Sequence, residues 1–204
     1  MMDKKIKICG NTSIDIVHQL IELEIDYIGF IFYKPSPRNC SEILLEQLKN
    51  VDFKNSKPVC VFVDSDADTI RNVIECFKNP IIQFHGNESN NFCLSFKRPF
   101  WKVFSIKDNI DLNELERSDA DAILFDTHDS KLKGGTGNQF NWNLLSETIK
   151  INKKIILAGG INQENIDNAI NQDVFCLDIN SGVEFAPGEK DISLIKEIVH
   201  KVRA

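Results

Sequence analysis

The sequence has no long apolar run, no paired cysteines and no excess of positive charge. Its longest apolar runs, such as Ile28 to Phe32 and Pro58 to Val63, fall far below the roughly 20 residues that a membrane-spanning helix needs. We therefore expect buried strands there and no membrane partner. A formal net charge of -6 argues against nonspecific nucleic-acid binding, which depends on a basic face. An anionic small substrate stays possible, because a few backbone N–H groups and one Arg can bind it.

The cysteines lack the spacing of a metal site. The six are Cys9, Cys40, Cys60, Cys76, Cys93 and Cys176. They form no CxxC pair and no Cys/His spacing of the kind that zinc sites use. We expect free thiols and no metal.

The length and the amino terminus favour a single cytoplasmic domain. A chain of 204 residues can bury one good core, and a second full domain is not expected. Hydrophobic content of 42% and charged content of 26% lie near globular averages. The chain enters an apolar strand directly after Met1 to Lys5, which leaves no room for a secretion signal.

Short apolar runs alternate with helical stretches about eight times, which is typical of parallel strands joined by crossover helices. The predicted strands are Lys5 to Cys9, Tyr27 to Phe32, Pro58 to Val63, Ile81 to His85, Phe100 to Phe104, Ala122 to Asp126, Lys154 to Ala158 and Val174 to Ile179. The predicted helices are Ile14 to Leu23, Glu42 to Leu48, Thr69 to Phe77, Ser89 to Phe96, Trp142 to Ile149, Glu164 to Ile170 and Leu194 to Val202.

Eight strands close a barrel, so we predict a compact α/β fold, a single-domain TIM (β/α)8 barrel over residues 1–204. Asp111 to Arg117 supplies barely two turns, so the fifth helix should be short or missing. Ser181 to Glu184 matches a capping box, which predicts a short extra helix after strand eight. A doubly wound open sheet is the alternative, but eight strands in about 200 residues favours the barrel.

Cys9 and Asp126 are the candidate catalytic residues. In a TIM barrel the chemistry lies at the carboxyl ends of the strands, where Cys9 closes the first strand and Asp126 the sixth. A thiolate base and a carboxylic acid on opposite sides of the mouth suit proton transfer to two faces of one substrate. A lone Cys is more often a core hydrophobe and a lone Asp more often caps a turn, so their joint position carries the argument.

Two glycine turns predict a phosphate site. Gly159 and Gly160 follow strand seven, and Ser181 and Gly182 follow strand eight. Barrels of this type often hold a phosphate between these two loops, where N–H groups point at the anion. The alternative is that the glycines only make tight turns and Ser181 only caps. We favour phosphate binding, because both features fall in the expected loops.

Other residues at the mouth are candidates for binding the rest of a substrate. Arg38 can grip a carboxylate with its forked donors, or be a solvated surface residue. Asp178 is placed to bind sugar hydroxyls. His85 is expected either to line the pocket or to hold the backbone, and we favour the structural role.

The glycine-rich segment after the sixth strand predicts a mobile loop over the ligand, with a surface turn as the alternative. Its candidate substrate-binding residues are Gly135, Thr136 and Gly137.

Lys7 shares the strand face of Cys9. If Cys9 points into the mouth, Lys7 points into the barrel interior one layer below. A buried ammonium needs a partner, for which Asp126 or Asp178 is expected, with ordered water or backbone carbonyls as the alternative. The Lys7 charge should favour the Cys9 thiolate.

Seven short motifs occur in one order along the chain. They are Lys7 to Gly10, Gly29 to Arg38, Val61 to Val63, Gln83 to Gly86, Asp126 with Gly134 to Gly137, Leu157 to Gly160, and Ser181 to Glu184 followed by Pro187-Gly188. In these motifs the chain resembles the phosphoribosylanthranilate isomerase family over almost its whole length. Asp64 is one departure, since a neutral Asn is expected there.

The resemblance implies a cofactor-free Amadori rearrangement of N-(5-phosphoribosyl)anthranilate to 1-(2-carboxyphenylamino)-1-deoxyribulose 5-phosphate in tryptophan biosynthesis. It implies that Cys9 is the general base, that Asp126 is the general acid and that Arg38 binds the anthranilate carboxylate. Near neutral pH this chemistry requires the pKa of Cys9 to be lowered and that of Asp126 to be raised. A monomer is one open option for the oligomeric state.

Two other functions are alternatives. The histidine-pathway isomerase performs the same rearrangement on a different aminoribose phosphate, but it uses a carboxylate where this chain has Cys9. A catalytically silent barrel that serves as a scaffold is the second, and the presence of both Cys9 and Asp126 argues against it.

Overall fold

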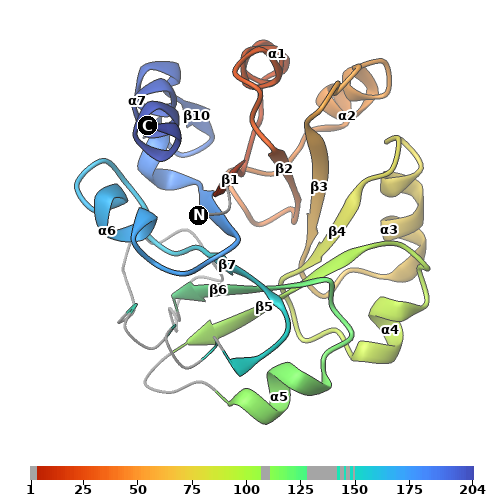
Figure 1. Cartoon of the computed structure of the whole chain (residues 1–204). Coiled ribbons are helices and arrows are strands. Elements are labelled where there is room, and N and C mark those ends of the chain that lie inside the picture. The colour runs from red at the N-terminus through yellow and green to blue at the C-terminus, as the bar shows by residue number, and fades with distance from the viewer. Residues whose placement is uncertain (1–3, 107–110, 128–141, 143–144, 146–147, 149) are drawn as a thin grey trace.

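The computed structural model of this chain describes residues 4–106, 111–127, 142, 145, 148 and 150–204. Eight parallel strands form a closed barrel in the order β1-β2-β3-β4-β5-β6-β7-β8, and β8 pairs with β1 (Figure 1). The helices lie outside the ring of strands. The predicted (β/α)8 barrel is therefore confirmed.

The strands agree closely with the predicted runs. They are β1 (Lys5–Ile8), β2 (Tyr27–Phe32), β3 (Lys57–Phe62), β4 (Ile81–Phe84), β5 (Phe100–Ile106), β6 (Ala122–Thr127), β7 (Lys154–Leu157) and β8 (Cys176–Ile179). Cys9, His85 and Ala158 were predicted inside strands and lie one residue beyond them. Their N–H groups still bond to the neighbouring strand, as Cys9 N does to the Ile179 carbonyl at 2.9 Å. These residues therefore form the rim of the barrel mouth.

The helices are α1 (Ile14–Glu22), α2 (Glu42–Leu48), α3 (Ala67–Ile74), α4 (Asn90–Leu94), α5 (Leu112–Arg117), α6 (Ile166–Ile170) and α7 (Ile192–Arg203). The side chains of Ser41, Asp66 and Ser89 cap the amino termini of α2, α3 and α4. The fifth helix is short, as predicted. Most of the helix predicted over residues 142–149 lies outside the described residues.

The segment after β8 differs from the expected capping box. The extra helix is one 3₁₀ turn, η2 (Ser181–Val183), followed by the hairpin β9 (Glu184–Ala186) and β10 (Glu189–Lys190). Asn180, and not Ser181, occupies the cap position, and no side chain caps the turn. The prediction of a capping box was wrong, because the Glu184 carboxylate accepts hydrogen bonds from the side chains of Arg38 and Lys190 instead.

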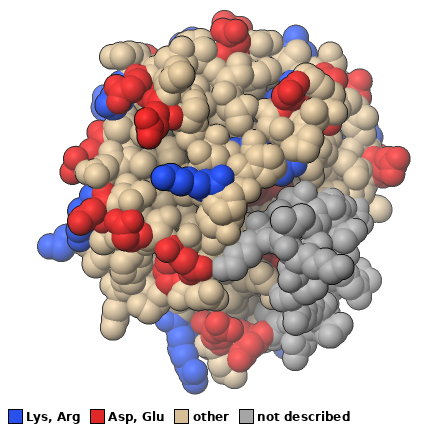
Figure 2. Space-filling model, turned by 180° about the vertical axis from the view of Figure 1, so that it is seen from behind, with Lys and Arg blue, Asp and Glu red and all other residues tan. Residues whose placement is uncertain are grey.

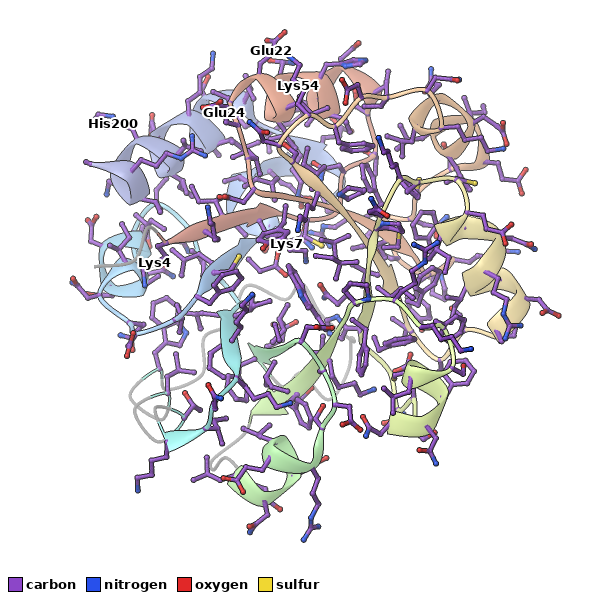
Figure 3. All side chains as sticks on the ribbon, turned by 45° about the vertical axis from the view of Figure 1, so that its right-hand side comes forward. Lys4, Lys7, Glu22, Glu24, Lys54 and His200 are labelled. Carbon is purple, nitrogen blue, oxygen red and sulfur yellow. The ribbon has the colours of Figure 1, made fainter. Side chains whose placement is uncertain are left out.

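Two apolar layers surround the strands, and the alternation of side chains decides which layer a residue joins. Ile6 and Ile8 of β1 pack outward under the helices, whereas Cys9 joins the barrel interior. Lys7 lies inside the barrel as predicted, with no exposed surface (Figure 3).

The described surface carries charges of both signs. On the face in Figure 2, acidic and basic side chains are interspersed among other residues. Within the described ranges, no helix combines the length and hydropathy that spanning a membrane requires.

Candidate active site

A pocket opens at the carboxyl ends of the strands. Its lining includes Cys9, Tyr33, Ser36, Arg38, Gln83, His85, Asp126, Gly159, Gly160, Asp178, Asn180 and Ser181. The predicted residues that the structure describes thus meet in one pocket, apart from Gly182, which is not part of its lining. Gly135, Thr136 and Gly137 lie outside the described residues.

A buried ion pair lies beside Cys9. The Lys7 ammonium donates to Asp178 Oδ2 at 2.6 Å and to Gln83 Oε1 at 2.9 Å. The predicted partnership is confirmed, and Asp178 is the partner. A Cβ added at Gly29 would lie 2.7 Å from the Cys9 sulfur and 3.1 Å from Lys7 Cε. Glycine at this position of β2 therefore leaves the room that the thiol and the ammonium occupy.

The electrostatics of Cys9 differ from the expectation. Burial raises the pKa of the Cys9 thiol, and the Lys7 charge opposes this rise only in part, since Asp178 acts in the other direction. The expected lowering of this pKa was wrong, because the loss of hydration of the thiolate outweighs the attraction to an ammonium already paired with a carboxylate.

His85 contacts the candidate acid. Its Nε2 atom lies 3.5 Å from Asp126 Oδ2. Burial, together with the nearby Lys7 charge, lowers the pKa of His85 to about 4, so the imidazole is neutral at pH 7. The sequence pattern favoured a backbone role for His85 and did not predict this contact, since β4 and β6 are not neighbours in the sheet.

The two glycine turns pack against each other. Gly159 and Gly160 have φ angles of +82° and +72°, in the left-handed region that glycine adopts most readily. A Cβ on Gly182 would lie 1.9 Å from the carbonyl oxygen of Ile161, so the loops after β7 and β8 meet there. The side chain of Asn165, which sequence reasoning missed, donates to the Gly160 carbonyl at 2.8 Å and holds the turn.

Arg38 is held by a buried carboxylate. Its Nε and Nη2 atoms donate to Glu184 Oε2 at 3.0 and 2.7 Å. Lys190 donates to the other oxygen of Glu184 at 2.7 Å. The roles of Glu184 and Lys190 were missed. The only signal was that two charged residues flank Pro187-Gly188, and the capping-box pattern accounted for one of them.

Asp64, the departure noted in the sequence, does not line the pocket. Its carboxylate accepts the backbone N–H of Asn87 at 2.6 Å. The Asp at position 64 therefore contacts the loop after β4 and not the pocket.

The order of these elements matches a known family. The family model described as N-(5'phosphoribosyl)anthranilate (PRA) isomerase matches residues 6–201. The chain belongs to the PRA isomerase family. This confirms the resemblance seen in the motifs, and it places this chain among the isomerases.

Relatives named N-(5'-phosphoribosyl)anthranilate isomerase match along nearly the whole chain. One from Hahella chejuensis is 37% identical over 96% of this chain and 92% of its own length. One from Legionella pneumophila strain Paris is 39% identical over 92% of this chain and 91% of its own.

Solved PRA isomerase structures share the fold. The Thermotoga maritima enzyme superposes with a TM-score of 0.85 at 27% identity, covering 98% of both chains. A PRA isomerase in complex with reduced 1-(o-carboxyphenylamino)-1-deoxyribulose 5-phosphate gives a TM-score of 0.82 at 26% identity, also covering 98% of both chains.

Proposed function

We propose that this isomerase rearranges N-(5'-phosphoribosyl)anthranilate in tryptophan biosynthesis with Cys9 as general base and Asp126 as general acid. One observation carries the proposal: a thiol and a carboxyl group line the same pocket as an arginine and two phosphate-type turns. The strands β7 and β8 separate the two groups around the barrel, so they can reach different atoms of one substrate.

Asp126 acts first. It gives its proton to the ring oxygen of the ribose, the bond between that oxygen and C1 breaks, and the nitrogen lone pair forms an iminium. A neutral His85 beside the carboxyl group adds no positive charge that would favour early loss of the proton. The raised pKa expected for Asp126 remains a prediction.

Cys9 acts second. Its thiolate removes the proton from C2 of the opened sugar, and the electron pair neutralises the iminium to give an enolamine. Tautomerisation of the enolamine yields the ketone, so the reaction is an isomerisation with no net gain or loss of atoms. Because burial raises the pKa of the thiol, the thiolate depends on the Lys7 ammonium below and on the cationic iminium above.

The remaining pocket residues bind the substrate. Arg38 takes the anthranilate carboxylate. Gly159, Gly160, Ser181 and Gly182 offer backbone N–H groups to the phosphate. Asp178 Oδ1 is buried with no hydrogen-bond partner among the described residues, which suits it to accept a sugar hydroxyl. Gly135, Thr136 and Gly137 are proposed to cover the bound substrate.

The proposal extends to the setting of the enzyme. We expect it to act in the cytoplasm, on a small molecule and without nucleic acid, which agrees with the formal net charge of -6.

The test is a fluorescence assay for loss of N-(5'-phosphoribosyl)anthranilate, with EDTA present and no cofactor added. We expect turnover by the wild type and by Cys76→Ala, which removes a thiol remote from the pocket lining. The histidine-pathway aminoribose phosphate is assayed in parallel. Turnover of that compound alone would overturn the proposal, as would a requirement for metal.

A further inference from the structure

We propose that Glu184 and Lys190 are positioning residues that aim one edge of the Arg38 guanidinium at the substrate carboxylate. The inference rests on the proposed function, in which Arg38 binds anthranilate. It concerns how a flexible arginine is kept in one orientation before the substrate arrives.

The Glu184 carboxylate occupies one edge of Arg38. Nε lies 3.0 Å from both carboxylate oxygens, and Nη2 lies 2.7 Å from Oε2. A guanidinium has five N–H donors in a rigid fork, so this pairing leaves both Nη1 donors and one Nη2 donor. None of the described residues accepts from Nη1, and Arg38 lines the pocket. The Nη1–Nη2 edge thus remains for a second, bidentate carboxylate.

Lys190 in turn holds Glu184. Its three donors reach Glu184 Oε1 at 2.7 Å, Asn180 Oδ1 at 2.9 Å and the Asn180 carbonyl at 3.0 Å. Only 1% of the Lys190 side chain and 4% of the Glu184 side chain are exposed. Because all three ammonium donors are used, Lys190 holds the Glu184 carboxylate in one orientation. The carboxylate in turn fixes the orientation of the Arg38 guanidinium.

The charges of this triad do not balance. Arg38 and Lys190 are two cations against the single anion of Glu184. Burial alone would raise the pKa of Glu184, but the hydrogen bonds from Arg38 and the charge of Lys190 together outweigh burial. The pKa is therefore lowered, and the carboxylate is ionised. Burial lowers the pKa of Lys190, and Glu184 opposes this. One buried positive charge in excess is unfavourable, and a bound carboxylate restores neutrality.

The hairpin after β8 builds the triad. Glu184 begins β9 and Lys190 ends β10, and the two are paired across the hairpin. The ladder shifts register between Glu189 and Lys190, so Lys190 lies opposite Glu184 and not opposite Phe185. Lys190 is buried, whereas its neighbour Glu189 is exposed. Thr12 Oγ1 donates to the Gly188 carbonyl at 2.5 Å and ties the hairpin to the loop after β1.

The experiment compares two ligands on matched variants by calorimetry. The first ligand is reduced 1-(o-carboxyphenylamino)-1-deoxyribulose 5-phosphate, and the second is the same compound without its carboxyl group. The proteins are wild type, Arg38→Ala, Glu184→Gln, Lys190→Met and the control Glu189→Gln, which removes an exposed carboxylate from the same hairpin.

Wild type and Glu189→Gln should bind the carboxylated ligand about 10- to 100-fold more tightly than the ligand without the carboxyl group. That ratio should fall below about 5-fold in Arg38→Ala, Glu184→Gln and Lys190→Met, while the affinity for the ligand without the carboxyl group changes by less than about 3-fold. The second ligand thus reports that each variant is folded.

The inference is overturned if Glu184→Gln or Lys190→Met keeps the wild-type ratio of affinities for the two ligands. An equal loss of affinity for both ligands also overturns it, since that result assigns the triad a purely structural role. A wild type that fails to distinguish the two ligands, or that binds neither, instead contradicts the proposed function.

Discussion

The Lys7 ammonium lies 2.6 Å from Asp178 Oδ2, and both side chains are buried in the barrel interior. The pair places a cation beside the Cys9 thiol and a carboxylate next to that cation. Desolvation and Coulomb attraction therefore oppose each other at Cys9, and desolvation is the larger effect. The thiolate form of Cys9 therefore depends on positive charge close to the sulfur.

Replacement of Lys7 by Met should move the pH dependence of the reaction. In wild type, kcat/KM should pass through a maximum with pH, because turnover needs the thiolate of Cys9 and the protonated carboxyl group of Asp126 together. Without the ammonium the thiol pKa rises further, so the limb of the profile that reports Cys9 should move to higher pH by about one unit or more. The measurement is kcat/KM from pH 6 to about 10.

Lys5→Met is the matched control, because Lys5 pairs with Asp26 at the partly exposed start of the same strand. Lys7→Met leaves Asp178 buried without its partner, at a cost of about 3 to 5 kcal/mol, so both profiles are recorded well below the variant's Tm. A limb that stays at the wild-type pH would show that Lys7 does not act on the base.

Cys9→Ala and Asp126→Asn should each lower kcat by about 10²- to 10⁴-fold, the usual effect of removing a positioned base or acid. KM should change much less, because neither group is proposed to bind the ground state. Steady-state kinetics provide the measurement, with Cys76→Ala as control. A Cys9→Ala enzyme with near wild-type kcat would sink the assignment of the base.

His85 should make the folded state sensitive to acid. Its pKa is lowered to about 4 in the folded protein, against about 6.5 unfolded, so below pH 6.5 the unfolded chain binds the extra proton. Stability is fully present above pH 6.5 and declines as the pH falls towards 4, by up to about 3 kcal/mol.

His85→Gln should remove this part of the acid sensitivity. Urea unfolding of both proteins at several pH values between 4 and 7 gives the difference. Parallel curves for the two proteins over that range would contradict the prediction.

Gly182→Ala should disturb the phosphate site. The new Cβ would meet the Ile161 carbonyl oxygen at 1.9 Å, so one of the two loops must move. We expect a loss of about 1 to 3 kcal/mol in the free energy of unfolding. The affinity for inorganic phosphate should fall by about 10-fold or more, because the N–H groups no longer converge. Ser181→Ala keeps the backbone donors and is the control; equal phosphate affinity in all three proteins would contradict the site.

The sequence by itself determined the barrel and the composition of its mouth. The alternation of short apolar runs with helices predicts parallel strands, and residues that end such strands must meet at one edge. The two-residue period of a strand also placed Lys7 inward below Cys9, whatever its neighbours. These conclusions need only local pattern and general topology.

Only the tertiary structure decided which groups meet. Closure of the barrel sets β8 beside β1 and aligns Asp178 with Lys7, a contact 171 residues apart in the chain. It also turned Glu184 from an expected helix cap into the partner of Arg38. The direction of the Cys9 pKa depended on depth of burial, which no local pattern reports. Sequence pattern fixes the side of a strand that a residue occupies, whereas solvation and long-range pairing are properties of the assembled fold.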